Sequence, residues 1–157
     1  MIGWREWVGL PDLGIEFVKA KIDTGARSSA LHAFDIHVSE SAGVEVARFK
    51  VHPFQRQTST TILAVAEVAE YREVRSSSGH RSLRPVIVTM VTLGDESWPI
   101  ELTLVNRDEM GFRMLLSRGA VRGRFLIDPD RSFVAGRGPP RRRRTRAKSK
   151  KGRPRSK

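Results

Sequence analysis

The stretch Val18-Lys19-Ala20-Lys21-Ile22-Asp23-Thr24-Gly25-Ala26 decides the interpretation of this chain, because an apolar run with strand character ends on an acid, a hydroxyl and a glycine. Glycine permits a sharp turn, and an Asp at the mouth of a strand can be held by main-chain amides. A carboxylate held in this way can activate a water molecule. It can also serve an ordinary turn, so the remainder of the chain has to distinguish the two interpretations.

The basic charge is concentrated at the C-terminus. The chain has 157 residues, enough for one domain with a buried core. Eleven of its 29 Lys and Arg lie in residues 141–157, which contain no acid, so the first 140 residues hold 18 basic and 17 acidic side chains. We therefore divide the chain into a domain, residues 1–136, and a basic tail, residues 137–157, expected to be disordered.

The composition of the tail indicates its partner. Lys and Arg without interleaved aromatic residues attract phosphate without regard to sequence, and salt weakens this attraction steeply. RNA or the ribosome, contacted through residues 141–157, is therefore the expected partner. A solvated extension without a function is the alternative.

Two absences limit the remaining possibilities. The chain has no cysteine, which excludes disulfides and thiolate metal sites. No stretch approaches the ~20 apolar residues of a membrane span, and Met1 to Asp12 lacks the continuous apolar region of a secretory signal. We expect a cytoplasmic protein that has no membrane partner.

Short apolar runs separated by turn residues predict an all-β barrel or sandwich. A change of apolar phase within Ile15 to Ile22 predicts a bulge. Ser117 to Arg122 is expected to form one helical turn, and Thr61 to Tyr71 reads as a strand for which a helix stays possible. The other predicted strands are Met1 to Leu10, Phe34 to Val38, Val44 to Val51, Pro85 to Leu93, Ser97 to Val105, Met114 to Leu116 and Ser132 to Val134.

The tripeptide has a wider context that resembles a known fold. An apolar strand leads into Asp-Thr-Gly-Ala, and the segment Met114 to Arg118 follows about ninety residues later. This combination resembles the retropepsin-like aspartic peptidases. More closely, Lys21 to His32, Ile100 to Asp108 and Met114 to Arg118 resemble the bacterial family labelled ATP-dependent zinc proteases. Members of that family are associated with ligases that add glutamate to ribosomal protein. The resemblance covers Trp4 to Val134 and implies a small closed barrel with at most one short helix.

The resemblance implies a site shared by two copies of the chain. Retropepsins take one Asp from each subunit, and this chain contains one Asp-Thr-Gly. A homodimeric aspartic endopeptidase would use Asp23 of both subunits to activate a water for peptide-bond hydrolysis. Thr24 would hydrogen-bond across the dimer axis, and Gly25 would let substrate and partner come close. Ala26 and Arg27 would contact the substrate.

Two further segments receive roles from the resemblance. Arg72 to Arg84 is a polar hairpin in the place of a flap that closes over substrate, with Ser78 and Gly79 at its tip. Leu115, Leu116, Ser117 and Arg118 would support the Asp23 loop. Ser117 stands where the resemblance expects a glycine, so we expect that turn to differ or to be strained.

The family label implies groups for which the sequence offers no motif. It has no His-Glu-x-x-His and no glycine-rich phosphate loop, so we expect neither zinc nor ATP as a cofactor and no metal site. His32 with His37 is the only candidate ligand pair, and ordinary core or surface roles are favoured for both. A non-catalytic peptide-binding or regulatory partner of a glutamate ligase remains the alternative function.

Overall fold

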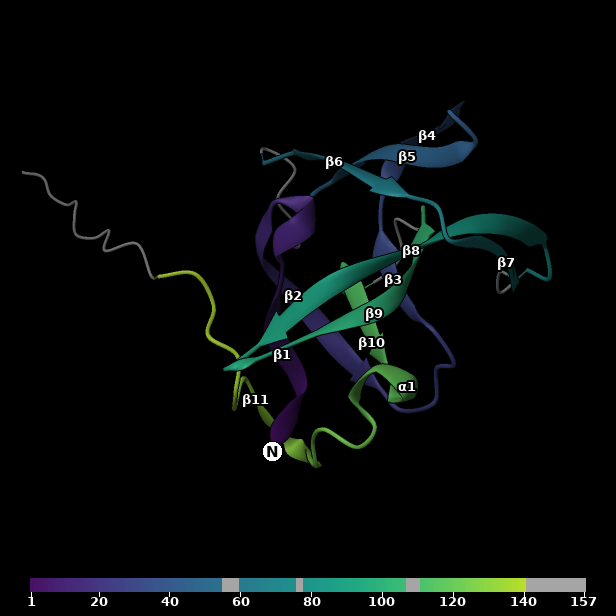
Figure 1. The fold of residues 1–157 in the computed structure, drawn as a ribbon. Coiled ribbons are helices and arrows are strands. Elements are labelled where there is room, and N and C mark those ends of the chain that lie inside the picture. The colour runs from purple at the N-terminus through teal and green to yellow at the C-terminus, as the bar shows by residue number, and fades with distance from the viewer. Residues whose placement is uncertain (55–59, 76–77, 107–110, 141–157) are drawn as a thin grey trace, which may run out of the picture.

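The computed structural model describes residues 1–54, 60–75, 78–106 and 111–140 (Figure 1). The basic tail from residue 141 and the Arg107-Asp108 end of one resembling segment lie outside the described residues. The first half holds β1 (Ile2–Leu10), η1 (Pro11–Leu13), β2 (Ile15–Asp23), β3 (Ser29–His32), β4 (Phe34–Ser41), β5 (Val44–Val51) and β6 (Ile62–Glu67). The second half holds β7 (Glu70–Arg75), β8 (Arg81–Leu93), β9 (Glu96–Val105), β10 (Met114–Ser117), α1 (Arg118–Val121) and β11 (Ile127–Ser132).

Six strands close into a barrel. They are hydrogen-bonded in the order β1-β2-β10-β3-β9-β8, and β8 returns to β1 through the pairing of Thr92 with Gly9. Outside this ring, β11 adds to β1 in parallel and β7 adds to β8. The described residues contain a single α-helix, of four residues. The prediction of an all-β closed barrel with at most one short helix is confirmed.

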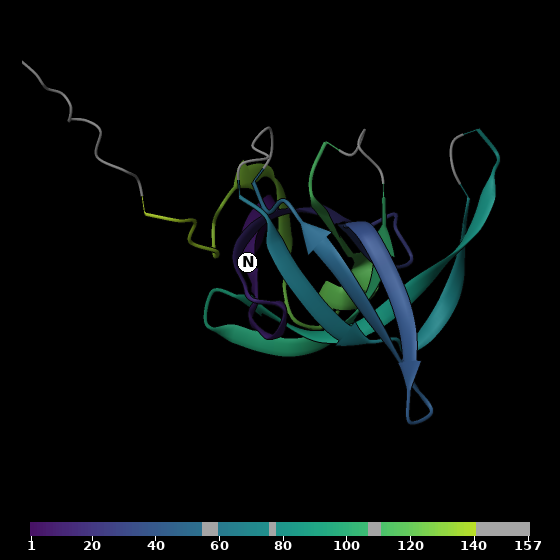
Figure 2. The ribbon, with the colours of Figure 1, turned by 90° about the horizontal axis from the view of Figure 1, so that it is seen from above.

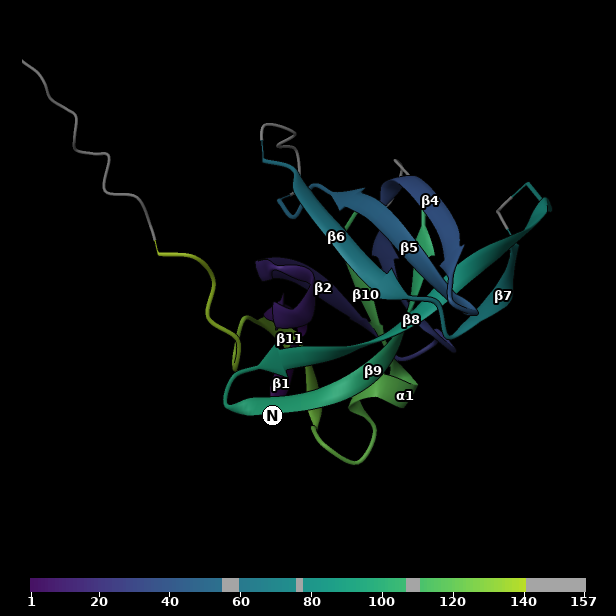
Figure 3. The same ribbon diagram turned by 45° about the horizontal axis from the view of Figure 1, so that its top comes forward.

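A second sheet, β4-β5-β6, lies over one side of the barrel (Figures 1 and 3). Its strands alternate, so that Ala47, Phe49 and Ala64 join the core of the barrel while Leu63 and Val65 face outward. Both sheets therefore share one hydrophobic core.

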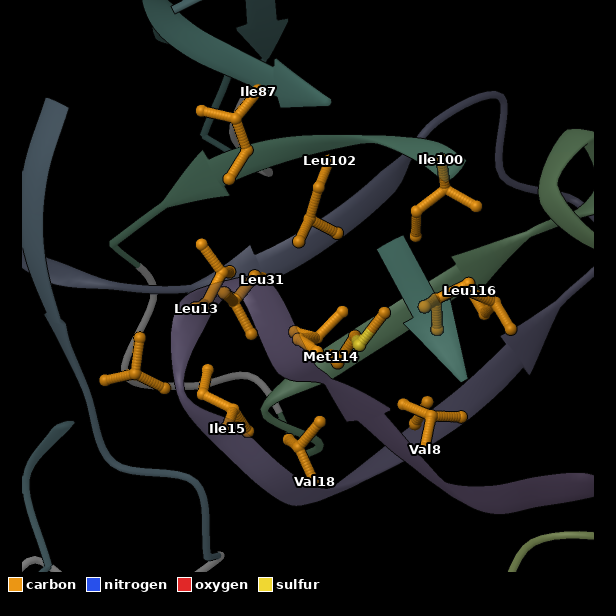
Figure 4. Packing of buried hydrophobic residues seen from close by; sticks show 14 of the residues in the cluster. Val8, Leu13, Ile15, Val18, Leu31, Ile87, Ile100, Leu102, Met114 and Leu116 are labelled. Atoms are coloured by element: carbon orange, nitrogen blue, oxygen red, sulfur yellow. The ribbon is translucent and has the colours of Figure 1, made fainter. Parts of the chain in front are cut away.

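That core fills the inside of the barrel (Figure 4). Ile15 and Val18 from β2, Leu31 from β3 and Leu102 from β9 are fully buried there with Met114 from β10. These side chains come from strands that are distant in sequence. Because the interior is closely packed, they hold the ends of β2, β3 and β10 in register with one another.

The predicted bulge lies in β2. Val8 pairs with Val18 and Leu10 pairs with Ile15, so two steps on β1 face three on β2. Ile15 and Val18 are consequently both buried, although a regular strand would place them on opposite faces. This extra residue in β2 explains the change of apolar phase in the sequence.

Two strand predictions were wrong in their extent. The run Thr61 to Tyr71 is divided between β6 and β7, which belong to different sheets, because Val68 and Ala69 donate hydrogen bonds to Glu45 and to Val86. The helical alternative for this run was also wrong. The last strand lies at Ile127–Ser132 rather than at Ser132 to Val134, since parallel pairing with β1 extends it through Asp128-Pro129-Asp130.

The β7–β8 hairpin and the C-terminal segment leave the barrel on opposite sides (Figures 1 and 2). The hairpin is the one predicted for Arg72 to Arg84, and its residues 76 and 77 lie outside the described ranges. Among the described helices, none has the length and apolar character needed to cross a membrane.

Candidate active site

Asp23 is the last residue of β2 and lies half-buried beside Ser117, its register partner on the parallel strand β10. The chain turns directly after it. The amide of Gly25 donates to Asp23 Oδ1 over 3.1 Å, and the amide of Ala26 donates to the Asp23 carbonyl over 3.1 Å. These bonds orient one carboxylate oxygen toward the loop. The sequence prediction of an Asp held by main-chain geometry at a strand end is confirmed.

A pair of buried hydroxyls supports this loop from below. Ser29 Oγ lies 3.1 Å from Ser117 Oγ and accepts the amide of Ser117 over 3.0 Å. Ser117 Oγ also accepts the amide of Ala120 over 3.3 Å and so caps α1. The bonds join the start of β3 to the end of β10, the strand that lies between β3 and β2.

The expected strain at Ser117 is absent. Its backbone is extended, with φ −77° and ψ 165°, a conformation that any residue adopts. A serine fits where the resemblance expected a glycine, and its hydroxyl makes contacts that glycine could not make. The role of Ser29 was missed, because two serines 88 positions apart give no local signal in the sequence.

The other support residues lie on the same strand and helix. Leu116 is fully buried in the core and Leu115 is half-buried, as alternation along a strand requires. Arg118 begins α1, where its carbonyl accepts the amide of Arg122 and its side chain is exposed. The contact that Arg118 makes here is therefore through its main chain, not its side chain.

The loop residues Thr24 and Gly25 are exposed. In the part of the chain that the structure describes, the Thr24 hydroxyl makes no hydrogen bond. A Cβ on Gly25 would lie 3.6 Å from Asp23 Oδ1, an ordinary contact, so the fold of one chain does not require glycine there. Glycine at position 25 would therefore matter to a molecule that approaches the loop from outside the chain.

A cavity of about 440 Å³ opens beside the loop, between the start of β3 and α1. Arg27, Ser28 and Ser29 line one side of it, and Ser117 lines the floor. Asp23 itself does not line it. Three more cationic side chains reach the cavity and were not anticipated: Arg72, Arg122 and Arg124. The repeated arginines directly after the support strand were the available signal.

Some of these arginines are engaged within the chain. Arg72 forms ion pairs with Glu70 and, at 2.9 Å, with Glu101. The hydrogen bond to Glu101 is the main reason that the pKa of Arg72 is raised above its ordinary value. Arg124 lies over the Trp98 ring at 4.9 Å, and the indole of Trp98 donates to the Ala120 carbonyl. Arg27 and Arg122 form no ion pair with any described acid.

The two predicted flap residues are not brought to the cavity. Ser78 and Gly79 are exposed near the tip of the β7–β8 hairpin, and Gly79 has a φ of 88°. Arg72, at the other end of the hairpin, is the residue that reaches the cavity. Substrate contact by Ser78 and Gly79 therefore stays a prediction that depends on movement of the hairpin.

The described residues contain no group of three His, Cys, Asp or Glu side chains that could hold a metal ion. His32 is buried in the barrel, whereas His37 is exposed and lies 2.8 Å from Asp35. Asp35 in turn binds Lys50 at 2.9 Å. His37 thus belongs to a surface ion-pair cluster.

A closed all-β barrel in which a strand ends at the Asp of Asp-Thr-Gly, beside a parallel strand, is consistent with the retropepsin-like fold. The family model described as "Retropepsin-like aspartic endopeptidase RimB" matches residues 1–138. The chain belongs to this RimB-like family.

The curated relatives and a similar solved structure carry other descriptions. Over 136 residues the chain is 47% identical to a "Probable alpha-L-glutamate ligase" of Parasynechococcus marenigrum and 40% identical to one of Shewanella pealeana. In each case 87% of this chain is covered, but only 29% and 30% of the relative, so the chain spans less than a third of their length. A solved structure of a Legionella pneumophila protein of unknown function is 28% identical, with a TM-score of 0.70 over 85% of this chain and 96% of that one.

Proposed function

We propose that this chain is one half of a homodimeric aspartic endopeptidase, in which the Asp23 carboxylates of two copies share the attacking water. The position of Asp23 carries this proposal: it ends β2 in an exposed turn, oriented by the Gly25 amide, in a chain of the retropepsin-like family. One chain supplies one such acid, so the second has to come from a second copy.

The chemistry follows from two carboxyl groups in one place. Two adjacent carboxylates cannot both ionise cheaply, so one keeps its proton while the other removes a proton from water. The water oxygen attacks the amide carbon while the protonated carboxyl gives its proton to the carbonyl oxygen. The C–N bond then breaks as the other carboxyl passes the proton taken from water to the leaving nitrogen, and a hydroxyl proton of the intermediate returns to the first carboxyl. The exposed Thr24 and the unexplained Gly25 are the residues that a second copy would contact.

The cavity beside the loop favours an acidic peptide as substrate. Arg27 and Arg122 have no acidic partner among the described residues, and arginine binds carboxylates with two parallel hydrogen bonds. The name of the curated relatives, alpha-L-glutamate ligase, fits a substrate that carries added glutamate. Ala26, next to Arg27 in the loop, would contact the peptide backbone.

Cleavage of a glutamate-rich peptide by the purified chain tests this function. Asp23→Asn should abolish cleavage and leave the dimer intact, whereas Asp130→Asn, which changes an exposed Asp outside the site, should leave cleavage unchanged. Arg27→Ala and Arg122→Ala should raise KM for glutamate-rich peptides more than for neutral ones. Cleavage that survives Asp23→Asn would end the proposal.

A second candidate is a non-catalytic regulatory partner of a glutamate ligase, favoured by the relatives that carry this domain within longer proteins of that name. It predicts an effect on ligase turnover that Asp23→Asn does not change. Contact of the tail with RNA or the ribosome would be compatible with either function. That contact rests on the sequence of residues 141–157 alone.

A further inference from the structure

A row of alternating rings and cations runs along the β1–β2 hairpin, from Arg5, the register partner of Lys21, toward the turn between the two strands. The guanidinium carbon of Arg5 lies 4.8 Å from the ring centre of Trp4 and 5.0 Å from that of Phe133. Lys19 Nζ lies 5.4 Å from the ring centre of Trp7. The rings of Trp7 and Phe133 are stacked, with centres 6.0 Å apart. We call Trp4, Arg5, Trp7, Phe17, Lys19 and Phe133, which are all half-buried, the aromatic face.

The fold holds Phe133 in an unfavourable backbone conformation to place its ring there. Phe133 has a φ of 54°, a region that bulky residues rarely adopt. Its amide donates to the Arg5 carbonyl over 3.0 Å. The next three amides, of Val134, Ala135 and Gly136, donate to the buried carboxylate of Glu6. The position of this ring is thus imposed by the surrounding structure.

The aromatic face borders a cavity of about 710 Å³, large enough for a planar ring system. Trp7, Phe17 and Phe133 contribute to its walls, with Arg137 at the rim. Two acids, Glu16 and Asp95, also line it. Phe17 is the ring of the aromatic face that is available for stacking, because it contacts no other ring or cation among the described residues.

The C-terminal segment passes this cavity, which Ala135, Gly136 and Arg137 line. Gly138 lies against the Trp7 indole, so closely that a Cβ would come within 2.4 Å of Nε1. The eleven Lys and Arg of residues 141–157 follow directly in the sequence, and they include no aromatic residue. The folded face therefore supplies the stacking surfaces that the basic tail lacks, at the point where the tail begins.

We propose that the aromatic face binds single-stranded RNA, with an unpaired base stacked on Phe17 in the cavity and a phosphate contacted by Lys19. Rings with interleaved cations are the usual means of holding single strands, and loops and single strands of RNA display unpaired bases. This interaction is independent of peptidase activity and adds a folded surface to the contact expected of the tail.

Fluorescence anisotropy of a labelled oligouridine with the full-length chain tests the proposal. Phe17→Leu, which keeps apolar volume but removes the ring, should weaken binding at least about fivefold, since one stacked base contributes roughly 1 to 3 kcal/mol. Phe17→Trp should restore or strengthen it. Lys19→Ala should weaken binding and reduce the salt slope by about 0.7, the value for one phosphate contact on a single strand.

Matched controls separate this face from general effects. Phe34→Leu changes another half-buried Phe, on β4, and Lys50→Ala changes a Lys of the other sheet; both should bind like the wild type, as should Asp23→Asn. A duplex RNA of equal length should bind less tightly, because its bases are already stacked. Equal binding of duplex and single strand, or wild-type affinity of both Phe17→Leu and Lys19→Ala, would overturn the proposal and leave the tail as a non-specific contact.

Discussion

Two acids on the β1–β2 hairpin differ in burial and in the number of amides that they bind. Glu6 is fully buried, and its carboxylate accepts the amides of Gly3, Val134, Ala135 and Gly136. Asp23, three residues beyond Ala20, the register partner of Glu6, is half-buried and accepts the amide of Gly25. A carboxylate surrounded by amides is a structural anchor. A carboxylate held by one amide in an exposed turn keeps lone pairs free for a water or for a second copy of the chain.

This difference indicates which region of the molecule contributes more to its stability. Glu6 joins the C-terminal segment to β1, and Gly136 and Gly138 pack against Trp7 with no space for a side chain. Beside Asp23 the Ser29–Ser117 pair is buried, whereas Thr24 and Gly25 of the loop are exposed. Substitutions around Glu6 should therefore affect stability, and substitutions around Asp23 should affect function.

The largest contrast in stability is expected between Glu6→Gln and Asp23→Asn. An amide at position 6 would turn N–H groups toward buried N–H donors, which should lower the free energy of unfolding by about 3 kcal/mol. Asp23→Asn should change it by less than about 0.5 kcal/mol, because the turn keeps an acceptor oxygen. Urea unfolding of both variants checks this, and equal losses would contradict the comparison.

Two glycines give the next contrast. A Cβ on Gly136 would come within 2.0 Å of the Trp7 carbonyl oxygen, a backbone atom that cannot move easily. Gly136→Ala should therefore destabilise the chain by about 2 to 3 kcal/mol. Gly25→Ala should leave the unfolding transition unchanged and should weaken dimer formation or peptide cleavage. Thermal unfolding and sedimentation measure the two effects, and a destabilised Gly25→Ala monomer would show that the loop is constrained within one chain.

Ser117 tests the support of the loop. Ser117→Ala removes the cap of α1 and one partner of Ser29, which should cost about 1 kcal/mol of unfolding free energy. Ser117→Gly, the residue that the family resemblance expected, should lose at least as much. A gain in stability with glycine would mean that the extended backbone at this position is strained after all. Denaturant midpoints of the two variants decide the matter.

The smallest effect is expected at Asp35, on the outer sheet. Hydrogen bonds from Lys50 and then His37 lower its pKa, so Asp35 contributes stability above its unfolded pKa, and this is lost as pH falls through the lowered folded value. Asp35→Asn should be slightly less stable than the wild type at neutral pH. The difference should vanish in acid, and a difference that grew there would have the wrong sign. Asn also tolerates the φ of 54° at this position.

Much of the barrel was predictable because its strands carry local signals. The bulge in β2 appeared as a phase change, and the turn after Asp23 appeared as Asp-Thr-Gly. The division of Thr61 to Tyr71 was not predictable, because Val68 and Ala69 bond to β5 and β8, which lie elsewhere in the sequence. The meeting of Arg72, Arg122 and Arg124 with Arg27 in one cavity was missed for the same reason, since it requires β3, β7 and α1 to be in place.

The sequence by itself determined the all-β class, the acid that ends β2 and the charge difference between the domain and the basic tail, because periodicity, turn residues and charge runs are local properties of a chain. Only the tertiary structure decided that Ser29 and Ser117 support the Asp23 loop, that Glu6 is an anchor, and that the aromatic face brings Phe133 together with β1 and β2. These depend on contacts between residues about ninety or more positions apart. Such contacts are selected by packing of the whole barrel and leave no local pattern.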